Sequence, residues 1–121
     1  MTFLAFDYGA KRVGIATGNR ITGTAQPLKS VPPDFAVIGK IVQEWQPEAL
    51  VIGVPFHPDG AAHQITERAR KFGRQLSGRF HLPVHEVDER YTSVEAESYG
   101  VDDVDSTAAA LILEQFFREH P

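Results

Sequence analysis

Three groups of acidic residues lie where apolar runs of the sequence end or begin. Asp7 follows the run 3–6, Asp88 and Glu89 follow a second strand-like run, and Asp105 opens a final apolar stretch. In α/β proteins the carboxyl ends of strands border the crevice that binds ligands. Carboxylates meeting there are suitable ligands for Mg²⁺ or Mn²⁺, and a pair of such ions can activate water and stabilise the leaving oxygen of a phosphodiester. The pattern predicts a metal site built from three acids.

Each acid also has a structural explanation that its position alone does not exclude. Asp7 fits a turn before Gly9, in which an aspartate accepts hydrogen bonds from the following amides. Neighbouring residues of a strand point to opposite faces, so only one of Asp88 and Glu89 is expected to enter the site, and the alternative is a solvated strand end. Asp105 belongs to a residue type that favours helix caps.

Periodicity predicts the elements that must position these acids. Three strands joined by short loops should be antiparallel, and a continuously apolar strand later in the chain should be buried in a parallel position. The strands are expected at 3–6, 12–18, 21–28, 49–54 and 83–88, and the helices at 35–45, 61–79 and from about Asp105 onward. This order predicts an α/β fold: a mixed five-stranded sheet, with three antiparallel strands and then parallel strands, and helices on both faces.

The bulk composition limits the class of protein. The 121 residues fit one domain, expected to span 1–121. The absence of cysteine excludes disulfides and thiolate metal sites, which leaves oxygen and imidazole ligands. No apolar stretch approaches the roughly 20 residues of a membrane helix, and the N-terminus lacks the charged leader of a signal peptide. We therefore expect a cytoplasmic protein with no membrane partner.

The net charge of −4 conceals an uneven distribution. Residues 1–85 carry ten Lys and Arg against six Asp and Glu, whereas residues 86–121 carry two against ten. A basic body with a carboxylate-rich end is compatible with a nucleic-acid partner. Arg68 and Lys71, on the helix expected at 61–79, are candidates for contacts with the nucleic-acid backbone. The alternative is an ordinary solvated helix face.

Four segments follow one another along the chain: DYGAKRVGIA at 7–16, IGVP at 52–55, DERYTS at 88–93 and DSTAAALILEQF at 105–116. Together they resemble the YqgF or RuvX family, Holliday-junction-resolvase-like proteins of the RNase H-like superfamily. The resemblance implies an RNase H-like fold and divalent-metal nuclease chemistry on structured nucleic acid. It also implies either Holliday-junction cleavage or maturation of the 5′ end of pre-16S ribosomal RNA.

The resemblance assigns roles by motif position. Asp7, Glu89 and Asp105 match the three acids that would hold Mg²⁺ or Mn²⁺. The polar positions around these acids would contact nucleic acid. They are occupied by Arg12, Arg90 and Thr92. One segment departs from the family: the stretch 94–104 is short and acidic, where the family usually has a longer and often basic segment.

The sequence leaves three functions in competition. The first is a metal-dependent nuclease that acts on RNA, DNA or both, as a monomer or weak homodimer. The second is a non-catalytic nucleic-acid-binding or assembly factor on the same fold, suggested by the acidic segment 94–104. The third is an actin-like nucleotide-binding domain, which also has Asp-x-Gly after a first strand but normally needs two related domains.

Overall fold

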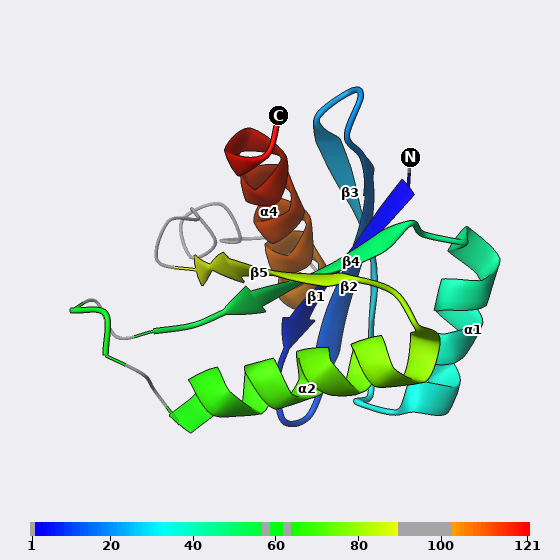
Figure 1. Ribbon diagram of the computed structural model, residues 1–121. Coiled ribbons are helices and arrows are strands. Elements are labelled where there is room, and N and C mark those ends of the chain that lie inside the picture. The colour runs from blue at the N-terminus through cyan, green and yellow to red at the C-terminus, as the bar shows by residue number, and fades with distance from the viewer. Residues whose placement is uncertain (1, 57–58, 62–63, 90–102) are drawn as a thin grey trace.

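The computed structural model describes residues 2–56, 59–61, 64–89 and 103–121, and its central feature is a five-stranded sheet (Figure 1). The strand order is β3-β2-β1-β4-β5, in which β1–β2 and β2–β3 are antiparallel while β1–β4 and β4–β5 are parallel. The strands are β1 Thr2–Tyr8, β2 Val13–Asn19, β3 Thr24–Val31, β4 Ala49–Val54 and β5 Val84–Asp88. The predicted mixed sheet is confirmed.

Helices cover both faces of this sheet, also as predicted (Figure 1). Helix α1 (Phe35–Trp45) and helix α2 (Gln64–Phe80) pack on one face, and helix α4 (Val104–Glu119) packs on the other. Asp34 caps α1 as expected, accepting a hydrogen bond from the Ala36 amide at 2.8 Å. No helix in the described ranges is both long and apolar enough to cross a membrane.

Strand alternation assigns each acid to a face of the sheet. In β1, Leu4 and Phe6 belong to the core beneath α1 and α2, whereas Phe3 and Ala5 belong to the core beneath α4. Because side chains alternate along a strand, Asp7 continues the row that faces α4. We call this side of the sheet the α4 face.

Most elements lie within a few residues of their predicted bounds, and the third strand is among those that differ most. The third strand begins at Thr24 rather than Ile21, because residues 20–22 form the turn after β2 and Ile21 is 77% exposed. Proline cannot donate to strand pairing, which predicts that Pro27 helps to end the strand, but Pro27 lies within β3. Pro27 is tolerated because β3 is an edge strand and its pairing with β2 shifts register beside Ala16. The three- and four-residue spacing of Ile38, Ile41 and Trp45 predicts that all three face the core, but Trp45 is 37% exposed at the end of α1.

Candidate active site

Asp7 and Glu89 meet on the α4 face, at the carboxyl ends of two parallel strands. Asp7 is the last residue but one of β1, and Glu89 directly follows β5. Their carboxyl groups share a hydrogen bond. Two carboxyl groups can form such a bond only when one of them carries a proton. This juxtaposition selects Glu89, and not Asp88, as the partner of Asp7.

Gly53 on β4, the strand between β1 and β5, makes room for this pair. A Cβ atom at Gly53 would lie 2.5 Å from Oε1 of Glu89 and would also collide with the side chain of Ile112. Any residue other than glycine would therefore displace the ends of the Glu89 and Ile112 side chains. Glycine inside an apolar strand is a known sign of such close approach.

The electrostatics of the pair show a concentration of negative charge. Burial, then the charge of Glu89, the hydrogen bond between the two groups and the charge of Asp105 raise the pKa of Asp7 from 3.8 to about 8. Burial also raises the pKa of Glu89; the hydrogen bond to Asp7 opposes this rise and the Asp88 charge adds to it. The shared proton therefore neutralises part of the negative charge of Asp7 and Glu89. A divalent cation could neutralise that charge instead.

Asp105 joins this region from the first turn of α4. The backbone there packs directly on Gly14 of β2, where a Cβ atom would overlap the carbonyl group of Asp105. Gly14 is the pairing partner of Asp7 in the antiparallel ladder. The register of β1 and β2 therefore places the beginning of α4 beside Asp7.

Asp103, and not Asp105, caps this helix. The Asp103 side chain accepts hydrogen bonds from the Ser106 amide at 3.1 Å and from the Ser30 hydroxyl of β3 at 2.6 Å. Partial burial would raise the pKa of Asp103, but these hydrogen bonds from Ser30 and Ser106 outweigh burial and lower it. The interpretation of Asp105 as the cap is therefore wrong, and its carboxylate is available for another role.

Arg12 forms the cationic border of the site. Its Nε lies 3.5 Å from Oδ2 of Asp105, and the Arg12 side chain is 71% exposed. Beside this ion pair is a hollow of about 330 Å³, lined by Arg12, Ser30, Asp103, Val104 and Asp105. Arg12 can thus hold Asp105 in place while most of its guanidinium remains open to an incoming anion.

The donor set fits a hard divalent cation only in part. Within the described ranges, no three His, Cys, Asp or Glu side chains converge closely enough to form a ready-made metal site. Once the shared proton is lost, Asp7 and Glu89 offer negatively charged oxygen ligands, and Asp105 lies within electrostatic range of Asp7. Mg²⁺ usually binds through one or two carboxylates and keeps several waters, so this pair is a sufficient protein contribution.

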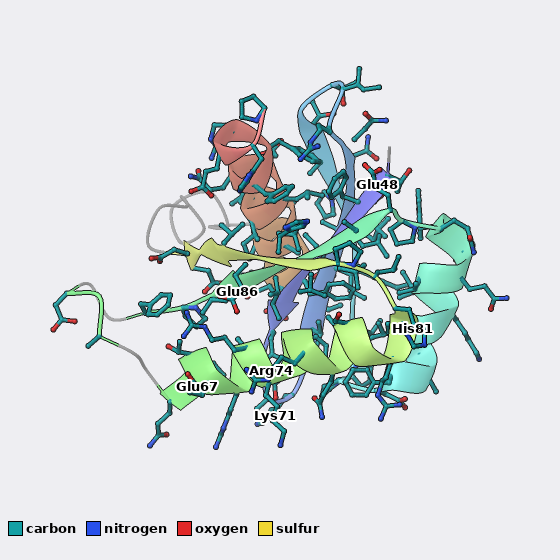
Figure 2. The ribbon with its side chains drawn as sticks, viewed as in Figure 1. Glu48, Glu67, Lys71, Arg74, His81 and Glu86 are labelled. Atoms are coloured by element: carbon teal, nitrogen blue, oxygen red, sulfur yellow. The ribbon has the colours of Figure 1, made fainter. Side chains whose placement is uncertain are left out.

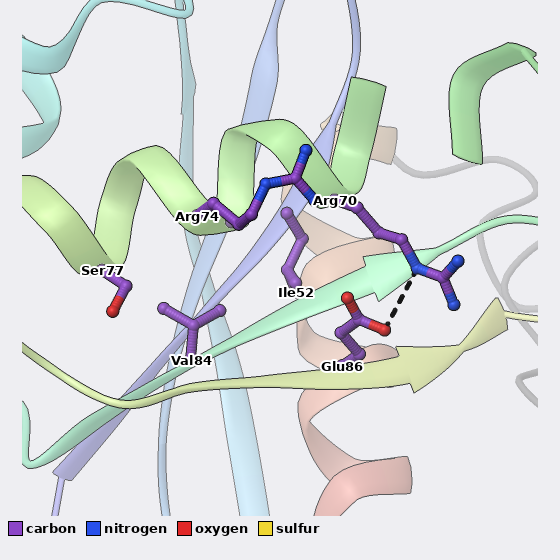
Figure 3. A pocket seen from close by; sticks show the side chains of 7 residues that line it. Ile52, Arg70, Arg74, Ser77, Val84 and Glu86 are labelled. Atoms are coloured by element: carbon purple, nitrogen blue, oxygen red, sulfur yellow. Dashed lines mark hydrogen bonds and ion pairs between the residues drawn. The ribbon is translucent and has the colours of Figure 1, made fainter. Parts of the chain in front are cut away.

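The other predicted contact residues are not all part of this cluster. Arg68 and Lys71 are exposed on α2, which covers the opposite face of the sheet (Figure 2). Their neighbour Arg70 forms ion pairs with Glu67 at 3.7 Å and with Glu86 of β5 at 3.3 Å (Figure 3). Arg90 and Thr92 were also predicted to contact nucleic acid. Both lie outside the described residues.

Sequence reasoning did not identify four residues that shape the site. Gly53 and Gly14 allow the close approaches, and Ser30 with Asp103 fixes the beginning of α4. The signal for the glycines was present, because small residues interrupt otherwise apolar strands. The contact between Ser30 and Asp103 joins distant parts of the chain and leaves no local pattern.

Comparison with known proteins agrees with this architecture. Residues 1–119 match the sequence pattern of the family described as RuvX: Holliday junction resolvase. The chain belongs to the RuvX family. A RuvX relative from Albidiferax ferrireducens is 59% identical over 97% of this chain and 78% of its own length. Another, from a Polaromonas species, is 52% identical over 99% and 90%. Both carry the provisional name pre-16S rRNA nuclease.

Solved structures confirm the RNase H-like fold of this RuvX protein. RuvC of Thermus thermophilus, solved in complex with a Holliday-junction substrate, superposes with a TM-score of 0.68 at 14% identity, covering 98% of this chain and 95% of RuvC. The fowlpox virus resolvase, also solved with Holliday-junction DNA, gives a TM-score of 0.53 at 12% identity and covers 98% of both chains. At these identities the likeness concerns the fold.

Proposed function

We propose that this protein is a divalent-metal-dependent nuclease that hydrolyses phosphodiester bonds in structured nucleic acid. The observation that carries the proposal is the buried carboxyl pair of Asp7 and Glu89, with Asp105 beside it, at the carboxyl edge of an RNase H-like sheet. The names of the RuvX relatives support precursor 16S ribosomal RNA as the first substrate to test, and the family description supports four-way junction DNA as the second.

The roles of the side chains follow from their positions. Asp7 and Glu89 would hold the cation between their carboxylates, and Asp105 would complete the acidic border of the site. A bound Mg²⁺ or Mn²⁺ would supply Lewis acidity at the phosphate and a nucleophilic water. Arg12 orients Asp105 through their ion pair and presents its exposed donors to a phosphate oxygen. Gly53 keeps the two acids close enough to share one cation.

A cleavage panel with Mg²⁺ and Mn²⁺ tests this proposal. The substrates are precursor 16S ribosomal RNA, a four-way DNA junction, and single-stranded and duplex controls. Wild-type protein should cut at least one structured substrate, and Asp7→Asn should lose at least about 100-fold in rate because one cation ligand is gone. Asp34→Asn is the matched control, since Asp34 caps α1 on the opposite face and asparagine caps equally well.

The same panel distinguishes the alternatives. Undiminished cleavage by Asp7→Asn would remove the proposed site. Substrate binding without turnover under either metal would favour a non-catalytic assembly factor on this fold. Cleavage confined to precursor RNA or to the junction would define the natural substrate class.

A further inference from the structure

A second polar cluster occupies the far end of the α4 face, around the ring of Phe116. Arg20, in the turn after β2, places its guanidinium carbon 5.9 Å from the centre of the Phe116 ring. The rings of His85 from β5 and of His120 from the end of α4 lie against the same phenylalanine, with centroid distances of 5.0 and 4.6 Å. We call Arg20, His85 and His120 the Phe116 patch.

In the Phe116 patch, exposed basic side chains lie over buried aromatic rings. Phe116 is 1% exposed and the adjacent Phe3 is 3% exposed, whereas Arg20, His85 and His120 are all exposed. Arg20 also lies 5.4 Å from the centre of the Phe3 ring. Cation–π contacts of this kind hold planar basic groups in place without using their hydrogen-bond donors.

None of the ion pairs in the described ranges involves Arg20, His85 or His120. Burial first, and then the charges of His120 and Arg20, lower the pKa of His85, so its imidazole is more readily neutral than usual. A neutral imidazole still donates one hydrogen bond from its N–H group. Arg20 thus presents an exposed cation beside two imidazole donors, a donor set that suits an anionic ligand.

The patch lies on the same face of the sheet as the carboxyl pair. His85 precedes Glu89 by four residues along β5, and Phe3 precedes Asp7 by four along β1. At a rise of about 3.3 Å per residue, the two sites are separated by about 13 Å. One nucleic-acid strand can therefore contact both. Arg68 and Lys71 have no such relationship to the acids, because α2 covers the opposite face.

We propose that Arg20, His85 and His120 bind a backbone phosphate of the nucleic-acid substrate, about 13 Å from the phosphodiester bond held at Asp7 and Glu89. The identity of the ligand as nucleic acid rests on the proposed function. The guanidinium can donate two parallel hydrogen bonds to phosphate oxygens, and each imidazole can donate one. Such a contact fixes the register of the strand and carries no sequence preference.

Binding measured without divalent metal separates this proposal from catalysis. Fluorescence anisotropy with a fluorescein-labelled single-stranded RNA and a four-way DNA junction, both in EDTA, gives Kd across a salt series. The triple variant Arg20→Gln, His85→Gln, His120→Gln should bind about 10-fold more weakly at low salt. The slope of log K against log salt should fall by about 1 for the lost phosphate contact. The control Lys40→Gln, His81→Asn changes exposed basic groups outside the patch.

A second measurement uses the wild-type protein and does not depend on the folding of any variant. The imidazole proton resonances of His85 and His120 should shift when the unlabelled RNA is added, while those of His81 stay unchanged. Unchanged affinity in the triple variant, equal weakening in the control, absent histidine shifts or no binding by the wild type would each overturn the proposal. Failure of the cleavage panel with these binding results intact would reject the nuclease and leave the phosphate contact standing.

Discussion

The carbonyl group of Asp105 lies directly over Gly14, so that no side chain can be accommodated between the first turn of α4 and β2. Gly14 pairs with Asp7, and the contact therefore joins two of the three acids through the backbone of the sheet. The position of Asp105 is set by the packing of main chain on main chain, which tolerates less adjustment than contacts between side chains.

Gly14→Ala should destabilise the protein and disrupt the site together. The new methyl group overlaps the backbone of Asp105, so α4 must move away from β2, at a cost of about 1–3 kcal/mol in the free energy of unfolding. Urea denaturation measures this loss. Gly78→Ala is the matched control, because Gly78 lies in α2 with open space around it, and alanine there should stabilise by about 0.5–1 kcal/mol. An equally stable Gly14→Ala protein would contradict the close packing.

Asp7→Asn should change the pH dependence of stability. The pKa of Asp7 is about 8 in the folded protein against 3.8 as the ordinary value, so the folded state retains a proton that the unfolded state loses. Wild-type stability should therefore fall as the pH rises from about 4 to about 8, by up to about 1.4 kcal/mol per pH unit. Asp7→Asn removes this contribution and should be the more stable protein at neutral pH. Urea denaturation across this range measures the profiles, and the control Asp34→Asn should stay parallel to the wild type. A parallel profile for Asp7→Asn would contradict the expectation.

Mg²⁺ should displace the proton shared by Asp7 and Glu89. Cation binding favours the fully ionised pair, so it should release about one proton near neutral pH and raise Tm. At about 100 times Kd the stabilisation should be about 2.7 kcal/mol. Calorimetry in buffers of different ionisation enthalpy counts the protons, and thermal denaturation measures the shift. Asp7→Asn and Glu89→Gln should lose both effects, whereas retention of both in either variant would place the cation elsewhere.

Ser30→Ala should loosen the beginning of α4. The variant removes the 2.6 Å hydrogen bond that Ser30 donates to Asp103, at a cost of about 1.5–3 kcal/mol for a bond to a charged group. It should also weaken Mg²⁺ binding, because Asp105 follows Asp103 in the chain. Thr22→Ala is the control: its hydroxyl contacts Thr24 at an exposed turn, and its loss should cost less than about 0.5 kcal/mol. Equal effects of the two changes on unfolding in urea would contradict a special role for Ser30.

The sequence was sufficient to predict the elements because their apolar periods are regular. The continuous apolar run of β4 and the spacing of Ile38 and Ile41 in α1 each define one burial pattern. Local patterns failed where a tertiary contact decides. The sequence favoured Asp105 as the helix cap, but Asp103 takes this role and is held by the hydrogen bond from Ser30 of β3. A tertiary contact also decides the bounds of β3. Its edge position and its register shift against β2 accommodate Pro27 inside the strand.

The acids were predictable to different degrees. Strand alternation indicates that Asp88 and Glu89 point to opposite faces but cannot say which face α4 covers. That choice follows from the sheet order, which places Asp7 and Glu89 on the same side with Gly53 between them. The catalytic and metal-binding roles of Asp7, Glu89 and Asp105 remain predictions for the experiments above.

The strand order β3-β2-β1-β4-β5 has a consequence for the biosynthesis of the protein. Asp7 is made well before Asp105, and α4 packs on strands that are synthesised before it. Contacts between such distant segments form late and slow the folding of a domain. A ribosome-bound chain that has not yet released α4 therefore lacks the third acid and leaves Phe3 and Ala5 uncovered. Order of synthesis thus delays assembly of the site until α4 has been made.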